Sequence, residues 1–452
     1  MKALVVPVAL GVILCADAAL FGVLIEHTEY RHHALRLYCL ATPLFALAVV
    51  LLARCRLPRR AALLVIFGAG IVLQVIAVSQ HTTTTDDDYR YIWDAKVQLA
   101  GIDPYRYAPT APELAPLREE FLFPGTRCPH RVGELCSAVN RPTVHTVYPP
   151  VAEAAFVAIR LASFGGQGHH FPVQLAGALG MVAIGALLAR HALARDRPLW
   201  PVALWLWCPL PIMEYSNAGH IDWLAILLTV LGLGLAASRR SVAGGLLLGA
   251  AIATKLYPLV VLPALLRRRP LAVLGACVGL VALSYLPHVL AVGTDVIGYL
   301  PGYLREEQYT SGDRYLLLGE VLPSGLDTVA GVLVLGALAW WYARRADPAA
   351  PENSAVVLMG AVLLVTTPVY GWYAGLLLAL VVLSGALEWL PVALAPTLIY
   401  LIQGEFGLNP GMARVVYASA ALLSVAGYLL RRRHGVPTRG RPVQPAAGLA
   451  VR

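Results

Sequence analysis

Three consecutive carboxylates, Asp86, Asp87 and Asp88, directly follow an apolar segment that is long enough to cross a bilayer. A charge beside hydrocarbon costs free energy, so an acidic cluster at the mouth of a membrane helix predicts a functional site. A carboxylate in that place suits general base catalysis, in which it removes the proton of a hydroxyl group as the hydroxyl oxygen attacks a carbon atom. The alternative is a solvated cap that ends the helix.

Side chains from later parts of the chain are expected to complete such a site. Lys255 stands in an otherwise apolar stretch, where a basic residue usually has a partner or faces a cavity. Lys255, Arg305 and Arg314 are candidate cations for a phosphate leaving group, because each would offset the charge that grows as the bond breaks. The chemistry that fits is transfer of a sugar from a lipid phosphate to a hydroxyl. The predicted substrate contacts are Tyr91, Arg90, Glu214, His220, Asp222, Lys255, Tyr257, Arg305, Arg314, Trp372 and Tyr373.

These candidates also have simpler interpretations. The aromatic residues would fit the belt that lines a membrane interface. His220 would fit a hydrogen-bonded residue at a helix end, and Arg305 and Arg314 would fit solvated loop charges. A common site is favoured because the predicted topology puts all of these candidates on the same face of the membrane as the acidic cluster.

The composition indicates a polytopic membrane protein. The chain has 452 residues, of which 58% are hydrophobic and only 13% are charged, and apolar runs of about 15 to 22 residues recur along it. The net charge of +9 does not indicate a nucleic-acid partner, because the arginines stand in short clusters between apolar runs, as topology signals do. The scarcity of lysine and the Ala, Leu, Val and Gly bias suggest a bacterial source, which predicts a bacterial plasma membrane location.

The arginine clusters predict the topology when they are placed in the cytoplasm. Both termini are then cytoplasmic, and the acidic cluster is extracytoplasmic. We expect an all-α, multi-pass bundle of about 12 to 14 transmembrane helices, with a structured first loop that contains interfacial helices. The predicted parts are N-terminal transmembrane helices (1–79), an extracytoplasmic catalytic loop with interfacial helices (80–171), a transmembrane bundle (172–433) with an extracytoplasmic loop at 293–324, and a disordered cytoplasmic tail (434–452).

Cys128 and Cys136 are the only cysteines of the first loop. The oxidising outer side of the membrane allows them to pair, so we expect a disulfide. A metal site that uses Cys128, His130 and Cys136 is the alternative, but no second closely spaced Cys or His pair completes it. No set of residues clearly calls for a divalent metal, so we predict transfer without a metal or another cofactor.

Several motifs resemble those of the GT-C glycosyltransferases, which use polyprenyl-phosphate sugars. Asp87-Asp88-x-x-Tyr91, followed by Gly101-x-x-Pro104-Tyr105, is similar to their first-loop motif. The motifs that resemble the bacterial branch containing family 87 mannosyltransferases are Tyr148-Pro149-Pro150, Gly219-His220-x-Asp222, Lys255-x-Tyr257-Pro258 and Pro368-x-Tyr370-x-Trp372-Tyr373. The segment between Cys128 and Cys136 departs from this pattern and is expected to mark a subfamily with its own acceptor.

The resemblance implies an integral membrane hexosyltransferase that moves a sugar, with mannose expected, from a polyprenyl-phosphate donor to a cell-envelope lipid or glycan. It also implies inversion of the anomeric centre, with Asp87 as the base because of its spacing to Tyr91, and with Asp86 and Asp88 as alternatives. Arabinofuranose remains an alternative donor sugar. The partners would be the lipid-linked donor, the acceptor and membrane lipid. A transporter or flippase for lipid-linked sugars is the main alternative, since broken helices and intramembrane charge also suit it, and a non-catalytic envelope scaffold is a third.

Overall fold

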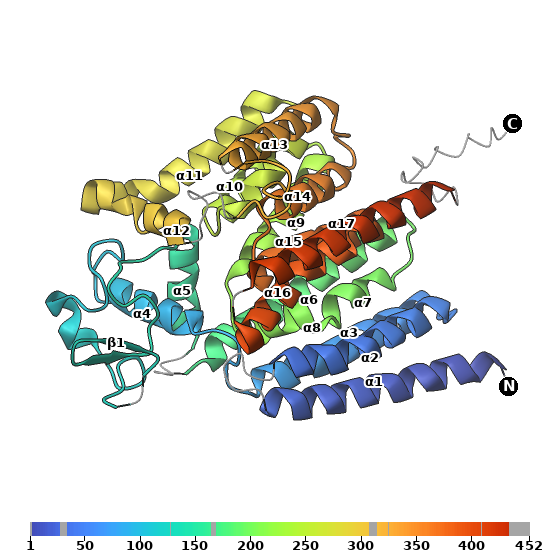
Figure 1. Ribbon diagram of the computed structural model, residues 1–452, viewed down its shortest axis with the longest axis horizontal. Coiled ribbons are helices and arrows are strands. Elements are labelled where there is room, and N and C mark those ends of the chain that lie inside the picture. The colour runs from blue at the N-terminus through green and yellow to red at the C-terminus, as the bar shows by residue number, and fades with distance from the viewer. Residues whose placement is uncertain are drawn as a thin grey trace, which may run out of the picture.

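The computed structural model describes residues 2–27, 34–126, 128–163, 169–306, 314–323, 325–407 and 409–433. These residues are almost entirely helical, and this confirms the all-α membrane fold predicted from the composition (Figure 1). The predicted tail at 434–452 and part of the predicted loop at 293–324 lie outside the described residues.

Three apolar helices open the chain, namely α1 (Lys2–Glu26), α2 (Ala34–Arg54) and α3 (Arg59–Val78). Each is long enough to cross a membrane, because about 20 residues of α-helix span about 30 Å. α1 packs against both α2 and α3, and α3 packs in turn against α6 (Phe171–Ala194). This contact joins the first helices to the rest of the bundle.

A compact loop region follows α3. It contains α4 (Asp87–Leu99), the 3-10 turn η1 (Pro112–Leu117), the antiparallel strands β1 (His130–Val132) and β2 (Leu135–Ser137), and α5 (Pro150–Ala162). α4 packs on α5 through a small apolar core that includes Tyr91, Trp93 and Phe156. In Figure 1 this region lies at one end of the bundle, whereas the start of α1 and the end of α17 lie at the opposite end. The termini of the bundle therefore face away from the acidic cluster.

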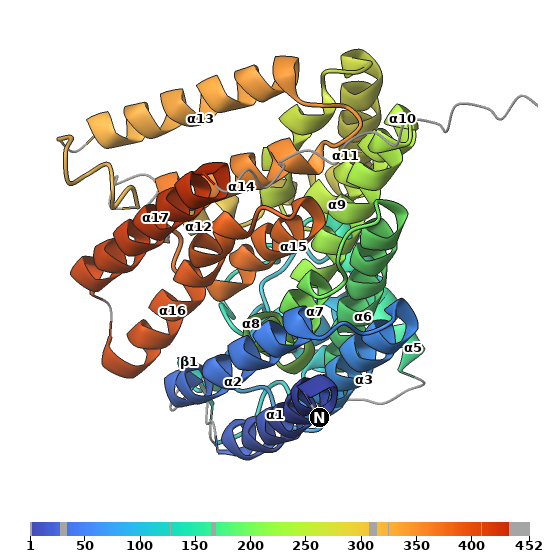
Figure 2. The same cartoon turned by 90° about the vertical axis from the view of Figure 1, so that its right-hand side faces the viewer.

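The remaining helices form the larger part of the bundle. After α6 they are α7 (Pro201–Leu206), α8 (Pro209–Pro211), η2 (Ile212–Asn217), α9 (Asp222–Ala237), α10 (Ser241–Ile252), η3 (Tyr257–Leu265), α11 (Pro270–Val292), η4 (Gly293–Ile297), α12 (Leu300–Glu306), α13 (Leu326–Arg345), α14 (Glu352–Thr366), η5 (Gly371–Tyr373), α15 (Ala374–Ser384), η6 (Leu387–Trp389), α16 (Leu390–Phe406) and α17 (Pro410–Arg433). Turned by 90°, the molecule shows α1 and α13 at opposite edges, with α9 and α15 between them (Figure 2).

The number of membrane-length helices is smaller than expected from the apolar runs. Within the described part of the chain, eight helices are long and apolar enough to span, or nine if one bent pair counts as a span. The expectation of about 12 to 14 counted most apolar runs as crossings, including runs that are shorter than a full span. Several of those runs instead form shorter helices, namely Ser241–Ile252, Glu352–Thr366 and Gly371–Ser384.

The bent pair is the feature of the bundle that positions the site. Pro209–Asn217 and Asp222–Ala237 meet at 115°. Proline cannot donate to the helical ladder, so Pro209 and Pro211 weaken the helix before the bend. Gly219 has a φ of +72°, in the left-handed region, and a Cβ atom there would lie 2.8 Å from the side chain of Val173. The break therefore requires glycine at position 219. Residues 218–221, which connect the two helices and include His220, are buried in the interior.

Candidate active site

The three aspartates at the start of α4 point in different directions, because successive helical residues are rotated by about 100°. Each carboxylate meets a histidine from a different part of the chain: Asp86 meets His130, Asp87 meets His220 and Asp88 meets His170. Asp88 is fully buried. Its burial raises the pKa of its carboxyl, although the hydrogen bond with His170 acts in the opposite direction. Asp87 is the carboxylate that faces the broken helix.

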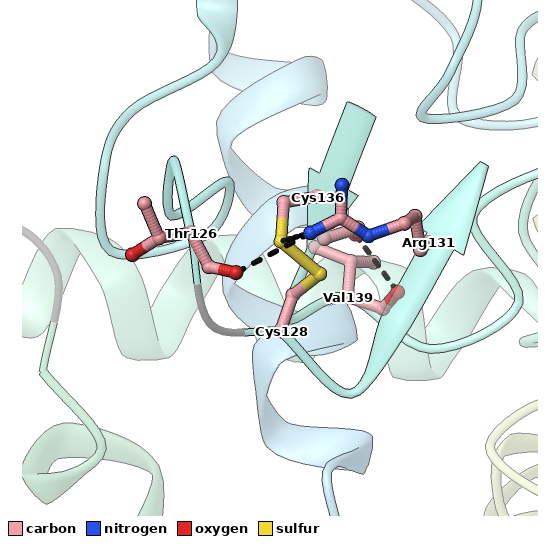
Figure 3. Close-up of a disulfide and its surroundings, with 6 residues drawn as sticks. Thr126, Cys128, Arg131, Cys136 and Val139 are labelled. Carbon is pink, nitrogen blue, oxygen red and sulfur yellow. Dashed lines mark hydrogen bonds between the residues drawn. A yellow bond between two sulfur atoms is a disulfide. The ribbon is translucent and has the colours of Figure 1, made fainter. Parts of the chain in front are cut away.

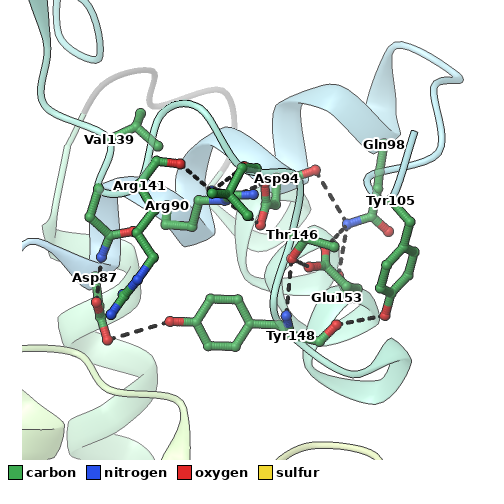
Figure 4. Close-up of polar contacts among 12 residues, drawn as sticks. Asp87, Arg90, Asp94, Gln98, Tyr105, Val139, Arg141, Thr146, Tyr148 and Glu153 are labelled. Carbon is green, nitrogen blue, oxygen red and sulfur yellow. Dashed lines mark hydrogen bonds and ion pairs between the residues drawn. The ribbon is translucent and has the colours of Figure 1, made fainter. Parts of the chain in front are cut away.

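Asp87 is surrounded by hydrogen-bond donors. Asn140 donates from Nδ2 to Oδ1 over 2.5 Å. The Tyr148 hydroxyl donates to Oδ2 over 3.4 Å (Figure 4). His220 Nε2 lies 3.5 Å from the same Oδ2. Burial by itself would raise the pKa of Asp87, but the hydrogen bond and charge of His220, together with the charges of Lys255 and Arg141, hold that pKa below its ordinary value. Asp87 is therefore ionised at neutral pH.

His220 connects Asp87 to a second carboxylate. Its Nδ1 lies 3.1 Å from Glu214 Oε2, while Nε2 faces Asp87. Both ring nitrogens of a protonated imidazole are donors, so such a ring can bond both carboxylates at once. Trp372 covers the ring, with 4.3 Å between the ring centroids. The bend of the helix thus produces a buried chain of three side chains, Asp87, His220 and Glu214.

Two cations stand beside this chain. Lys255 Nζ lies 3.3 Å from Asp222 Oδ2 and 5.0 Å from the centre of the Tyr148 ring. Lys255 therefore lies over the ring whose hydroxyl contacts Asp87. Arg141 approaches from the loop region, where its own backbone has a φ of +45°. Its guanidinium forms a two-point ion pair with Glu306 of α12, with contacts of 2.9 and 3.2 Å.

The structure gathers most of the predicted residues at one place. α4, the broken helix, the end of α10 and η5 converge there, and α4 contributes Asp87. The other predicted residues at this junction are Glu214, His220, Asp222, Lys255, Tyr257, Trp372 and Tyr373. Tyr257 and Tyr373 meet edge to face, with 5.7 Å between the ring centroids.

Other predicted residues have different surroundings. Arg90 is 2% exposed and binds both oxygens of Asp94 at 2.9 Å, so its guanidinium points away from Asp87. It also donates to the carbonyl of Val144 over 3.0 Å, and this bond holds the loop that leads to Tyr148. Tyr91 is buried and stacks on the ring of Phe156 at 4.4 Å. These two residues shape the loop region from inside.

The remaining two predicted cations, Arg305 and Arg314, come from α12 and from the segment before α13. Arg305 is exposed on α12. Arg314 is buried, and its carbonyl accepts a hydrogen bond from the hydroxyl of Thr367.

Tyr148 is held by a polar cluster that sequence reasoning did not predict. The Tyr105 hydroxyl donates to the Tyr148 carbonyl over 2.6 Å, and Thr146 Oγ1 accepts from the Tyr148 N–H over 3.1 Å (Figure 4). The same Thr146 hydroxyl donates to Glu153 over 2.6 Å, and Gln98 donates to the other oxygen of Glu153 over 2.7 Å. Burial, and then the neighbouring Asp94, raise the pKa of Glu153. The cluster fixes the backbone of Tyr148, whose hydroxyl contacts Asp87 and whose ring contacts Lys255.

Asn140 and Arg141 were also missed from the sequence. Both lie in an irregular segment after β2, where no periodic pattern predicts the direction of a side chain. The dipeptide Arg141-Pro142 is a weak turn signal, because proline restricts the backbone of the residue before it.

Cys128 and Cys136 are joined by a disulfide in the structure (Figure 3). Their sulfur atoms are bonded to each other, and so they do not form the alternative thiolate site with His130. In the described ranges no group of three or more His, Cys, Asp or Glu side chains has an arrangement that would hold a metal ion.

A model of the family described as glycosyltransferase family 87 matches residues 146–368, about half of the chain. The matched residues include Tyr148, His220 and Lys255, whereas Asp87 precedes them. Comparisons with curated proteins and with solved structures found no match. The broken helix and the cation beside it therefore lie within the region of family likeness.

Proposed function

We propose that this chain, which belongs to glycosyltransferase family 87 and is a membrane glycosyltransferase, transfers mannose from a polyprenyl-phosphate donor to a hydroxyl of a cell-envelope lipid or glycan. The observation that carries the proposal is the position of Asp87. It is an ionised carboxylate at the junction of the loop region and the bundle, and it is bordered by His220, Tyr148 and nearby cations.

In the proposed reaction Asp87 acts as the general base. The acceptor hydroxyl gives its proton to a carboxylate oxygen of Asp87 while the hydroxyl oxygen attacks the anomeric carbon. The bond from this carbon to the phosphate oxygen breaks at the same time, and its electron pair leaves with the polyprenyl phosphate. A single displacement from the opposite face inverts the anomeric centre. His220, whose Nδ1 is hydrogen-bonded to the backbone carbonyl of Glu214 and whose Nε2 lies at ion-pair distance from Asp87, keeps the carboxylate oriented.

Lys255 is the first candidate for the phosphate group, and Arg141 is the second. Each is paired with a carboxylate, Asp222 or Glu306, at the edge of the site. A phosphate carries more negative charge than a carboxylate and forms strong charge-assisted bonds, so it would compete for these cations. The charge that develops on the leaving phosphate would then be stabilised in a partly buried setting, where such interactions are stronger than in water.

The sugar is proposed to bind between the aromatic side chains and the acidic residues of the broken helix. The partly buried Tyr373 of η5 is the proposed aromatic contact, because the buried ring of Trp372 already meets the rings of His220 and Tyr370, and Glu214 and Asp222 offer acceptors for sugar hydroxyls. The arginine clusters favour an extracytoplasmic location of this site and cytoplasmic termini, because basic loops face the cytoplasm. The donor lipid would then reach the site from the outer leaflet.

The first test is sugar transfer in proteoliposomes from radiolabelled polyprenyl-phosphate mannose. The intact protein is compared with Asp87→Asn, which keeps the shape of the side chain but removes the base. Asp295→Asn is the matched control, because Asp295 is exposed on η4. We expect transfer by the intact protein and the control, and loss of transfer with retained donor binding in Asp87→Asn.

Two outcomes contradict the proposal. Normal transfer by Asp87→Asn would remove Asp87 from the role of base. An intact protein that moves the labelled lipid between leaflets but transfers no sugar would support the transporter alternative. A parallel assay with polyprenyl-phosphate arabinofuranose tests the identity of the donor sugar.

A further inference from the structure

A short hairpin, formed by β1 and β2, and the segment that follows it contact two of the three aspartates, Asp86 and Asp87. The disulfide joins Cys128 to Cys136 across β1 and β2, and Arg131 stands opposite Cys136 in the strand pair (Figure 3). His130 lies within the closed segment, and Asn140 follows four residues after its second cysteine. Both of these residues contact the aspartates at the start of α4.

The contacts of His130 and Asn140 fall on neighbouring carboxylates. His130 Nε2 lies 2.7 Å from Asp86 Oδ2. Asn140 Nδ2 lies 2.5 Å from Asp87 Oδ1 and 3.4 Å from Asp86 Oδ1. One amide group therefore stands between two adjacent carboxylates, and its nearer partner is Asp87. The histidine gives Asp86 a partner of its own.

The strands by themselves hold the hairpin weakly. Each strand has three residues, and Arg131 and Val132 are exposed. An isolated two-stranded hairpin is marginally stable in water, so a covalent link has a large effect on a segment of this size. The residues after β2 are better anchored, because the N–H of Ala138 donates to the carbonyl of Leu122 over 2.9 Å. Loss of the disulfide would therefore release His130 more readily than Asn140.

We propose that the disulfide-closed hairpin is a positioning element for the catalytic carboxylate, with His130 and Asn140 as its positioning residues. This inference rests on the proposed function of Asp87. While His130 contacts Asp86, the Asn140 amide is available to Asp87. Without His130, Asp86 is a second unpaired carboxylate beside the same amide. It then draws the amide away from Asp87, and the base loses its orientation. Sugar transfer thus depends on the oxidised state of the loop.

Reduction by a dithiol breaks the link without altering the sequence. Two electrons and two protons convert the cystine to two thiols, and the dithiol becomes a cyclic disulfide. The experiment measures kcat and the donor KM of the intact protein before and after treatment with dithiothreitol. The variants are Cys128→Ser with Cys136→Ser, His130→Ala and His130→Gln. Cys15→Ser is the control, because Cys15 is a free, exposed cysteine in α1.

We expect reduction, the double serine variant and His130→Ala to lower kcat about tenfold or more, since small misplacements of a catalytic group are costly. The donor KM should change less than kcat, because His130 and Asn140 contact the aspartates, whereas Lys255, the first candidate for the phosphate, pairs with Asp222 in the bundle. His130→Gln should recover much of the activity, since its amide can still donate to Asp86. The double serine variant should be insensitive to dithiothreitol, whereas the Cys15→Ser control keeps the disulfide and should lose activity on reduction as the intact protein does.

A second readout does not need activity. Hydrogen exchange at the amides of residues 86–91 should become faster after reduction, and the control should match the intact protein. If the intact protein transfers sugar while all hairpin variants stay within about twofold of it, the positioning role is wrong and the proposed function stands. If the intact protein transfers no sugar, the proposed function is wrong. Unchanged exchange on reduction would then overturn the structural part of the inference as well.

Discussion

His220→Gln is the substitution that tests the electrostatics of the site most directly. Glutamine can donate a hydrogen bond, but it carries no charge. A protonated His220 and an ionised Asp87 at 3.5 Å attract each other by on the order of 5 kcal/mol at an effective dielectric constant of about 20. Burial acts in the opposite direction and by itself would raise the pKa of Asp87, whose net shift is downward. Without the charge of His220, burial has more influence, and the pKa of Asp87 must rise.

The expected sign in the pH dependence follows from this change. The base works in its ionised form, so activity falls on the acidic side as pH drops through the pKa of Asp87. In the intact protein this acidic limb lies low, because positive charge holds the pKa of Asp87 down. In His220→Gln the limb should move to higher pH. The charged or titratable groups that still face Asp87 are Lys255, Arg141, Tyr148, Asp86 and Asp88.

The assay is kcat/KM for sugar transfer measured across the acidic and neutral range. His191→Gln is a matched control, because His191 also lies 3.5 Å from a carboxylate, that of Glu352, in a different part of the bundle. Its limb should not move. If His220→Gln loses activity at every pH and the limb stays in place, His220 does not act through the charge of Asp87. A direct contact with the donor would then be the better explanation.

Two other substitutions test the support of the site. Tyr148→Phe should lower kcat about fivefold, because a long hydrogen bond to a charged group contributes about 1 kcal/mol. The donor KM should stay constant, and a change in KM alone would contradict this prediction. Gly375→Ala should destabilise the bundle, because the new Cβ atom would lie 1.7 Å from the Tyr215 hydroxyl, and overpacking typically costs about 1 to 3 kcal/mol. A thermal shift in detergent checks this, with Gly279→Ala, where nothing lies within 4 Å, as the control that should melt close to the intact protein.

The sequence predicted the helical class and most members of the site, because both leave local signals. Apolar runs of membrane length mark spans wherever they occur. Polar residues inside such runs, such as His220 and Lys255, stand out because they cost free energy there. The number of spans was overestimated because run length alone does not separate a crossing helix from a short one. That distinction depends on how neighbouring helices cover the broken segments.

The arrangement of the aspartates was less predictable. Their histidine partners come from a hairpin, a helix start and a helix break, all distant in sequence from α4. No local pattern encodes such pairings. One missed signal was local, however. Arg90 and Asp94 are four residues apart on α4, a spacing at which opposite charges face each other on a helix. That spacing indicates a structural ion pair in place of a substrate contact.

The residues of the candidate site meet because the helix pair Pro209–Asn217 and Asp222–Ala237 is bent, and because the loop region is hydrogen-bonded to this pair. In a straight helix Glu214 and Asp222 would be about 12 Å apart along the axis, and they would not face a common point. The 115° bend breaks this straight axis, and His220 within it lies 3.1 Å from Glu214 and 3.5 Å from Asp87. Asn217, within the bend, accepts from the Thr83 hydroxyl over 2.8 Å and donates to the His81 carbonyl over 2.8 Å.

These bonds tie the end of α3 to the broken helix only a few residues before Asp87. The Tyr400 hydroxyl adds a bond of 2.6 Å to the carbonyl of Thr84, and the N–H of Val151 donates to the carbonyl of Ala253 over 2.9 Å. The proposed base Asp87 thus belongs to the loop region, while His220 and Lys255 belong to the bundle. The proposed catalytic geometry therefore requires that the loop region stays packed against the bundle. The broken helix contributes to this packing through Asn217, and it also supplies His220.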